Sequence, residues 1–303
     1  MEKENKSAVT WLDFERPSKA DIDAIKKIHD FHPIILDELL HFSTRSRVEQ
    51  YDSYLYLVYH FPIYDVKTRT SRRAEVDFLI TKDTVITIRY EPLEPIEYMR
   101  HAIAETPVLK KKYLSSGAMF MYSFLQAVHE FCLRELRHVD QKVTAITKDL
   151  FSHQEYQMLQ RISYIKRDIL DYGVITKPQA LILHSLRDVG GKFWGEEARI
   201  YLSDLASDHL KITEQLENYR DTIESCEETN AQLLNAKTNA VMQRFTILAF
   251  LTFPLMLFTS LFSIEFVSRE ITNPRIFWFG FGAVLLITSV VIYIFKRRGL
   301  LRD

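Results

Sequence analysis

The sequence has few cysteines, no excess of charge of one sign and no motif of a familiar enzyme class. Its only cysteines, Cys132 and Cys226, are too few for a disulfide framework and form no CxxC metal knuckle, so we expect two reduced, buried thiols. Its 39 basic and 40 acidic side chains nearly cancel, so no global field indicates nucleic acid or an acidic partner. The sequence shows no P-loop, glycine-rich dinucleotide fingerprint or nucleophile elbow, and it therefore gives little support to an enzyme.

Charge is absent from two runs near the end of the chain. Residues 245–264 and 276–295 each extend for about 20 residues without a charged side chain, the length at which a helix crosses roughly 30 Å of hydrocarbon. Buried core helices are the alternative, but such helices rarely run this far without a charge. The two runs therefore predict two transmembrane helices joined by a short loop, 265–275.

The residues that flank the two runs predict their orientation. Lys237 and Arg244 precede the first run and a basic tail, 296–303, follows the second, whereas the loop balances two arginines with two glutamates. By the positive-inside rule, both termini lie in the cytoplasm and the loop lies outside. The charged first residues lack the apolar core of a secretory signal. We therefore expect a multi-pass protein of the plasma or inner membrane with a large cytoplasmic part.

The first 95 residues alternate strand and helix patterns. Strands are expected where β-branched and aromatic side chains gather, over 9–14, 54–61, 75–81 and 84–90. The last two are separated only by Lys82-Asp83, as in a hairpin. Ser18 and Asp21 resemble a capping box that opens a helix over 20–29, and a second helix is expected over 34–42. These patterns predict an α/β domain over 1–95.

From about Pro95 onward the pattern is helical. Apolar residues recur at helical spacing over 115–151, and we expect antiparallel cytoplasmic helices over 96–193. Breaks are expected at Ser152-His153, Gly173 and Gly190-Gly191.

The longest predicted helix begins near Trp194 and contains no proline before Pro254. Seven residues keep alternating four- and three-residue steps, which is the seam of a helix that packs against a partner helix: Ile212, Leu216, Tyr219, Ile223, Cys226, Asn230 and Leu233. If the helix continues to Ile264, it has about 70 residues and a length of about 100 Å. We therefore predict a stalk over 194–244 that passes straight into the first membrane run.

The order of these parts resembles the CorA family of divalent cation channels and transporters. The resemblance is carried in order by residues 9–17 (VTWLDFERP), 35–40 (ILDELL), 51–58 (YDSYLYLV), 77–89 and 237–246 (KTNAVMQRFT), and by Pro254. It implies an α+β cytoplasmic domain with a long helical stalk and two C-terminal transmembrane helices. It also implies a CorA-like funnel of five identical chains, whose first membrane helices line a pore for divalent cations of the Mg, Co, Ni and Zn class.

One motif departs from the family. The family carries Tyr-Gly-Met-Asn at the outer end of the first membrane helix, where this chain has Phe262-Ser263-Ile264-Glu265. The resemblance therefore places Ser263 and Glu265 at the selectivity mouth. An amide ring suits a magnesium ion, which dehydrates reluctantly, whereas five carboxylates attract any cation. Preference for cations is expected to remain; magnesium selectivity and proton coupling are left open.

The resemblance also assigns residues to the pore and to a regulatory metal site. The pore-lining set, which keeps mostly to one helix face, is Asn239, Met242, Phe245, Ala249, Phe253 and Ser260. Met242, Phe245 and Phe253 would form apolar constrictions. Asp204 stands where the family has an aspartate implicated in metal sensing, and Asp208 follows one turn later. A divalent cation is thus implied as substrate and as regulator, although both carboxylates could instead be simply solvated.

Two further alternatives remain. The changed motif is also consistent with a non-conducting CorA-like membrane scaffold or metal sensor. His29 and His32 have a spacing seen in some metal sites, but a role at helix ends is favoured because further ligands are missing nearby. The expected partners are further copies of the chain, membrane lipids and divalent cations, and no nucleic acid.

Overall fold

A computed structural model of the protein describes residues 9–65, 67–68, 70–152, 154–263 and 274–297. The chain divides into two compact units, Met1–Glu227 and Glu228–Asp303, and helix α7 (Glu196–Ser263) contributes to both. The predicted mouth residue Glu265 and the predicted tail beyond Arg297 lie outside the described residues.

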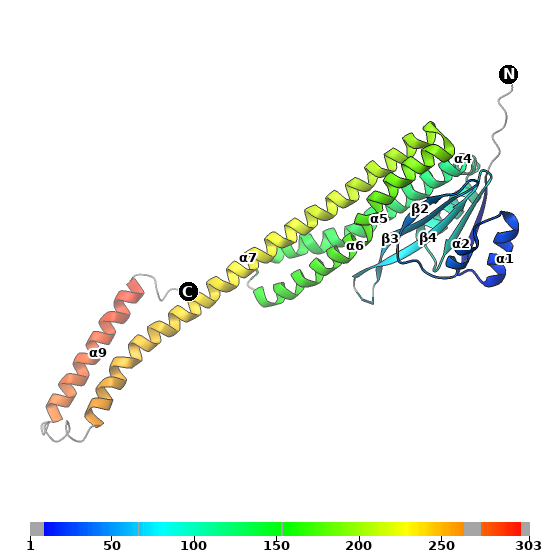
Figure 1. Ribbon diagram of the computed structural model, residues 1–303. Helices are drawn as coiled ribbons and strands as arrows, with labels where there is room; N and C mark the ends of the chain where they lie inside the picture. Colours follow the sequence, from blue (N-terminus) through cyan, green and yellow to red (C-terminus); the bar gives the residue numbers. More distant parts are fainter. Residues whose placement is uncertain (1–8, 66, 69, 153, 264–273, 298–303) are drawn as a thin grey trace. The chain divides into compact units, whose positions relative to one another are not determined.

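A five-stranded sheet forms the centre of the first unit (Figure 1). Its strands are β1 (Thr10–Glu15), β2 (Arg47–Gln50), β3 (Leu55–Asp65), β4 (Thr70–Ile80) and β5 (Thr84–Arg89), in the order β1-β5-β4-β3-β2. β1 pairs with β5 in parallel, and the other pairs are antiparallel. The predicted hairpin at Lys82-Asp83 joins β4 to β5, and the Thr81 N–H donates to the Thr84 carbonyl at 2.9 Å. The sequence did not predict the short edge strand β2, half of whose residues are charged.

Helices cover both faces of the sheet, because successive side chains of a strand point to opposite faces. On one face, Leu57, Tyr59 and Phe78 join a large core with α3 (Glu94–Glu105), α5 (Gly117–Asp149) and α6 (Glu155–Trp194). On the other face, Tyr56 and Leu79 pack with α1 (Lys19–Ile28) and α2 (Pro33–Glu38). The small helix α4 (Pro107–Tyr113) connects α3 to α5.

The ends of α1 and α2 confirm two predictions made from the sequence. Ser18 caps α1, and its backbone N–H donates to Asp21 at 2.7 Å, which completes the capping box. His32 caps α2 by accepting from the Ile34 N–H, while His29 lies 2.8 Å from the Ser53 hydroxyl just beyond α1. Both histidines therefore serve helix ends.

The predicted breaks at Gly173 and Gly190-Gly191 are wrong, because α6 continues through all three glycines. A Cβ at Gly173 would lie 3.3 Å from Leu216 of α7, and one at Gly190 would lie 2.5 Å from Leu202 of α7. These glycines allow the two helices to pack closely. The chain turns only at Gly195, whose φ of 98° lies in the left-handed region that glycine adopts without strain, and α7 then begins.

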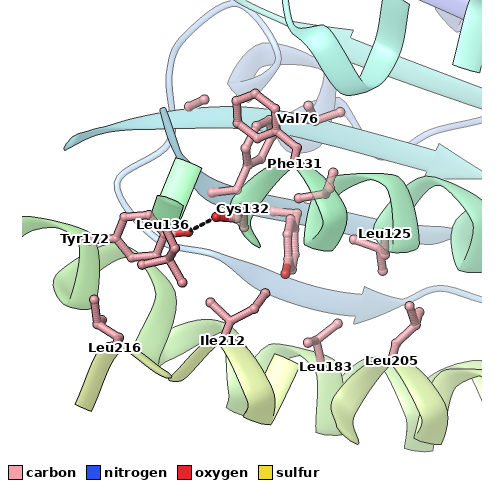
Figure 2. Close-up of a cluster of buried hydrophobic side chains, with 14 of the residues drawn as sticks. Val76, Leu125, Phe131, Cys132, Leu136, Tyr172, Leu183, Leu205, Ile212 and Leu216 are labelled. Carbon is pink, nitrogen blue, oxygen red and sulfur yellow. Dashed lines mark hydrogen bonds between the residues drawn. The ribbon is translucent and has the colours of Figure 1, made fainter. Parts of the chain in front are cut away.

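The predicted seam of α7 is buried within the first unit by the same chain. Ile212, Leu216, Ile223 and Cys226 are at most 5% exposed and belong to the large core. Figure 2 shows the first two residues of this seam, Ile212 and Leu216, beside residues of α5 and α6. There the Tyr172 hydroxyl donates to the Cys132 carbonyl at 2.8 Å. Both cysteines are buried free thiols, as predicted. The partner helices that the seam requires in this unit are thus α5 and α6.

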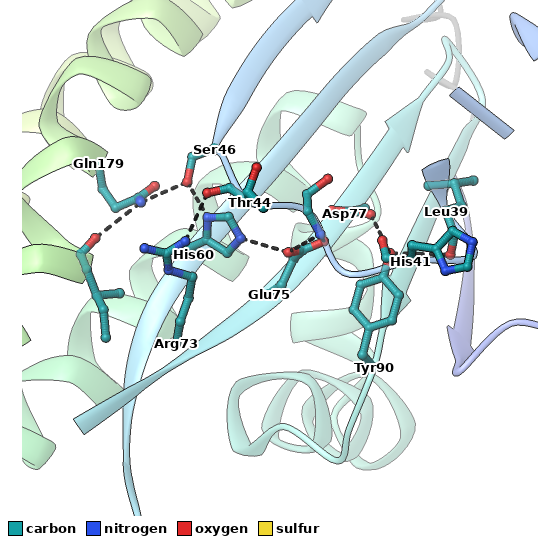
Figure 3. A network of polar contacts seen from close by, with 12 residues as sticks. Leu39, His41, Thr44, Ser46, His60, Arg73, Glu75, Asp77, Tyr90 and Gln179 are labelled. Atoms are coloured by element: carbon teal, nitrogen blue, oxygen red, sulfur yellow. Dashed lines mark hydrogen bonds and ion pairs between the residues drawn. The ribbon is translucent and has the colours of Figure 1, made fainter. Parts of the chain in front are cut away.

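A polar network crosses the sheet face opposite the large core (Figure 3). Nε2 of His60 lies 2.7 Å from the Glu75 carboxylate, which also accepts from the Ser43 N–H. Gln179 of α6 donates to the Ser46 hydroxyl at 2.8 Å, and that hydroxyl lies 2.6 Å from Nδ1 of His60. The network therefore ties the sheet to α6 through the segment before β2.

Asp77 lies beside this network with little compensation for its charge. It is 1% exposed, it accepts from the Tyr90 hydroxyl at 3.0 Å, and its Oδ1 has no partner among the described residues. Burial, followed by the negative charge of Glu75, raises the pKa of Asp77 well above its usual value. The fold thus favours the protonated form of this carboxyl.

We expect Asp77→Asn to stabilise the protein at high pH. Because the pKa of Asp77 is raised by folding, the folded chain binds a proton that the unfolded chain has lost. The free energy of unfolding therefore falls as pH rises from about 4 towards the folded pKa, by up to ~1.4 kcal/mol per pH unit. Asparagine removes this titration. Melting temperatures at about pH 5 and about pH 8 should show a gain for the variant that grows with pH; an unchanged pH dependence would contradict the assignment.

Candidate functional site

The second unit contains two helical segments long and apolar enough to cross a membrane. One lies within α7 and the other is residues Phe277–Ile294 of α9 (Pro274–Arg297). Most of their apolar side chains are exposed in the single chain, including Phe250, Leu257 and Leu286. Such a surface is unsuited to water and suited to lipid or to neighbouring protein. The apolar runs read from the sequence thus form two transmembrane helices.

The two helices of this unit contact each other through aromatic rings and one glycine. The ring of Phe258 in α7 lies 5.5 Å from that of Phe277 and 5.9 Å from that of Phe281, both in α9. A Cβ at Gly280 would lie 2.9 Å from Phe258, so the glycine makes room for this ring. Close approach at a small residue is the usual way in which membrane helices pack.

Phe258 belongs to a stripe of α7 that is less exposed than the rest of its membrane segment. The stripe consists of Ile247, Leu251, Pro254, Leu255 and Phe258. The six predicted pore-lining positions are all exposed, with Met242, Phe245 and Phe253 at 61–67%. At about 100° per residue, the centres of the two sets lie about 160° apart around the helix. The predicted pore-lining face is therefore the face of α7 opposite its contact with α9.

Hydroxyl groups near the end of α7 bond to the helix itself. Ser263, the last residue of the helix, donates to the Thr259 carbonyl at 3.0 Å, and Thr259 donates to the Met256 carbonyl at 2.9 Å. In an apolar surrounding, such internal bonds satisfy side chains that would otherwise lack partners. Ser263 thus ends the helix as an exposed polar residue next to the undescribed segment that contains Glu265.

The two predicted regulatory carboxylates lie in the first unit, one turn apart on α7. The Tyr122 hydroxyl of α5 donates to Asp204 at 2.9 Å, and Lys211 donates to Asp208 at 2.7 Å. Burial, and then its hydrogen bond to Asp204, raises the pKa of Tyr122 to about 12, so the hydroxyl remains a donor. Sequence reasoning missed Tyr122 because 82 residues separate it from Asp204.

One chain by itself does not complete a metal site around these residues. Within the described ranges, no three His, Cys, Asp or Glu side chains come together in a way that could hold a metal ion. Two carboxylates, each already paired with a donor, leave a divalent cation short of the six or more oxygen ligands that Mg²⁺ or Ca²⁺ prefers. Further ligands would have to come from water or from another chain.

Comparisons with known proteins agree with this architecture. A family described as CorA-like Mg²⁺ transporter protein matches residues 6–297. The cobalt/magnesium transport protein CorA of Thermotoga maritima is 22% identical over 302 residues, covering 96% of this chain and 83% of that protein.

Two solved structures share the fold. The complete CorA magnesium transporter of Methanocaldococcus jannaschii gives a TM-score of 0.81 at 18% identity, over 97% of this chain and 92% of that one. The ZntB cytoplasmic domain of Vibrio parahaemolyticus gives 0.57 at 16% identity, over 75% and 88%. The α/β domain, the long helix and the two C-terminal apolar helices predicted from the sequence are thus confirmed.

We expect Gly280→Ala to weaken the contact between α7 and α9. The added methyl group would displace the Phe258 ring, and overpacking of this kind costs about 1–3 kcal/mol. Gly282→Ala is the matched control, because a Cβ at Gly282 meets no atom within 4 Å. The melting temperatures of the two variants in detergent should differ, with Gly280→Ala lower. Equal melting temperatures would show that Gly280 is not needed for this contact.

Proposed function

The chain belongs to the family of CorA-like Mg²⁺ transporter proteins, and on this premise we propose that five copies form a pore that carries divalent metal cations across a membrane. Divalent cation transport is the function of the family, which is not enzymatic. The pentamer, the pore and its residues are proposed for this chain.

The free face of α7 in the second unit carries this proposal. Because α9 contacts one side of the helix at Phe258, the opposite side remains for other copies and for a central axis. Asn239 and Ser260 would provide polar groups on that side, while Met242, Phe245 and Phe253 would form apolar constrictions that expel water when narrow. The small side chain of Ala249 would leave the pore wider between Phe245 and Phe253.

At the mouth of the pore, we propose Ser263 and a ring of Glu265 side chains. Five carboxylates concentrate cations by their field and can bind them directly. They would discriminate less than amides in favour of a hydrated magnesium ion, so transport of Zn²⁺, Co²⁺ or Ni²⁺ is included in the proposal. A carboxylate ring could also titrate, which makes pH dependence a property to measure.

Asp204 and Asp208 are proposed to bind a regulatory cation together with groups of a neighbouring copy. The Tyr122 hydroxyl holds Asp204 in place, and binding of a cation would reduce the repulsion between carboxylates that the assembly brings together. A cation bound only in the closed assembly shifts the equilibrium towards that state. Transport would then slow when internal divalent cations are plentiful.

The membrane orientation and the domain bounds predicted from the sequence are also part of the proposal. Both termini are proposed to be cytoplasmic in the plasma or inner membrane. The proposed parts are the α/β domain (1–95), the antiparallel helices (96–193), the stalk (194–244), the two membrane helices (245–264 and 276–295), the outer loop (265–275) and the basic tail (296–303). A non-conducting scaffold or metal sensor of the same architecture is the alternative, and it is motivated by the changed motif at Glu265.

Ion flux in proteoliposomes tests the proposal directly. The purified full chain should carry at least one of Mg²⁺, Zn²⁺, Co²⁺ and Ni²⁺ down its gradient, as reported by an enclosed metal-sensitive dye. Empty liposomes serve as the control. Absence of flux for all four ions under every gradient would reject transport and leave the scaffold or sensor.

We expect Phe253→Ala to raise the flux severalfold. Truncation of a bulky ring at an apolar constriction admits water and lowers the barrier for a hydrated ion. Leu248→Ala is the control, because Leu248 is 54% exposed but lies about 120° from the centre of the proposed pore-lining face. If both substitutions change the flux equally, the assignment of the face is wrong.

Glu265→Asn should shift selectivity towards magnesium and remove a component of the pH dependence. The substitution replaces a titrating, charged ring with neutral amides that favour a hydrated ion. The measurement is the ratio of Mg²⁺ flux to Zn²⁺ flux between about pH 6 and about pH 8. An unchanged ratio and an unchanged pH profile would remove Glu265 from the mechanism.

A further inference from the structure

The described lining of a cavity in the first unit includes none of the proposed pore or regulatory residues. It occupies about 430 Å³ where the end of the β3–β4 hairpin meets α5 and α6, within the size range of small-molecule sites. Its lining consists of Tyr64, Thr68 and Thr70 from the hairpin, Lys142, Ala145 and Ile146 from α5, and Arg161, Tyr164, Ile165 and Arg167 from α6.

Among the described residues that line this cavity, every charged side chain is a cation. Lys142, Arg161 and Arg167 contribute three positive charges, and none of these described lining residues is a carboxylate. The carboxylates that pair with these cations lie outside it: Asp168 at 2.8 Å from Lys142, Asp149 at 2.8 Å from Arg161, and Asp171 at 3.6 Å from Arg167. The cavity therefore presents to a ligand the remaining N–H donors of three cations, each of which is already paired with a carboxylate.

Of these three cations, Lys142 is held in place by the most contacts. Its ammonium lies 4.6 Å from the centre of the Tyr64 ring and bonds to Asp168, whose carboxylate is only 1% exposed and also accepts from Ser71. Burial lowers the pKa of Lys142, but the bond and charge of Asp168 outweigh this and raise it overall, so the group stays charged. A fixed cation loses little conformational freedom on binding an anion.

The rest of the lining suits a flat apolar group. Ala145, Ile146 and Ile165 supply aliphatic surface, and Tyr164 at the rim is 73% exposed, with no ring partner among the described residues. Exposed tyrosine faces are platforms on which nucleic-acid bases stack. Thr68 and Thr70 lie on the hairpin side, where the Thr70 hydroxyl donates to Asp171.

We propose that this cavity binds a nucleoside phosphate, with the phosphates between Lys142 and Arg161 and the base against Tyr164. Guanidinium and ammonium groups bind phosphate by charge-assisted hydrogen bonds, and the aliphatic surface with the tyrosine accepts the ring. Inorganic phosphate would contact only the cationic side chains. Because the same cavity also offers aliphatic surface and Tyr164, it favours a ligand that combines a phosphate with a ring.

Calorimetric titration of the detergent-solubilised full chain with ADP, in metal-free buffer, tests the proposal. We expect one ADP per chain and binding that weakens with added salt. Arg161→Gln and Tyr164→Ala should each weaken ADP binding at least about fivefold. Lys142 is left unchanged because its loss would strand the buried Asp168 without a counter-charge.

Two controls test whether the cavity lining and the base account for the binding of ADP. Tyr156→Ala changes a tyrosine of α6 that is 77% exposed, similar to Tyr164 at 73%, but does not line the cavity. It should leave ADP binding unchanged, as should any variant with an unaltered lining. Tripolyphosphate carries charge without a base, so it should bind more weakly than ADP. Its affinity should be unchanged by Tyr164→Ala. The proposal is overturned if ADP does not bind at millimolar concentration, if Tyr156→Ala weakens it equally, or if tripolyphosphate binds as well as ADP. Matching melting temperatures of the variants exclude misfolding.

Discussion

The structure depends on the burial of one narrow apolar stripe along α7. In the first unit Leu205, Ile212, Leu216 and Ile223 are at most 2% exposed, and each such side chain contributes about 1.5–3 kcal/mol when buried. The stripe is buried by α5 and α6 of the same chain, so the single chain has a core without help from other copies. The other faces of α7 are therefore not needed for this core: one carries Asp204 and Asp208, the proposed regulatory residues, and in the second unit another carries the proposed pore residues.

Glycines set how closely the helices approach each other. Gly173 and Gly190 bring α6 against Leu216 and Leu202 of α7, and Gly280 brings α9 against Phe258. A single-sequence pattern cannot distinguish this use of glycine from a helix break, because both place a residue without Cβ inside a helical stretch. The neighbour across the interface decides, and that neighbour is remote in the sequence.

Polar groups divide into those that the fold satisfies internally and those that it leaves available. His60 and Glu75 satisfy each other beside the backbone of Ser43, and the buried carboxyl of Asp77 is favoured in its protonated form. The cations around the cavity between α5, α6 and the β3–β4 hairpin are also paired, but their donors still line a space large enough for a ligand. This difference separates the groups that stabilise the first unit from those on which we base a binding site.

The sequence by itself determined the class of this protein. Two uncharged runs, a seam of alternating three- and four-residue steps and a strand-rich beginning are local patterns, so they specified the membrane helices, the long helix and the α/β domain without knowledge of contacts. Only the tertiary structure decided which faces are used. The contact of Phe258 with α9 defined the free face of α7, and the bond from Tyr122 to Asp204 joined residues 82 positions apart. The cavity likewise combines side chains of three elements. Such arrangements depend on packing between distant segments, which no pattern along one chain encodes.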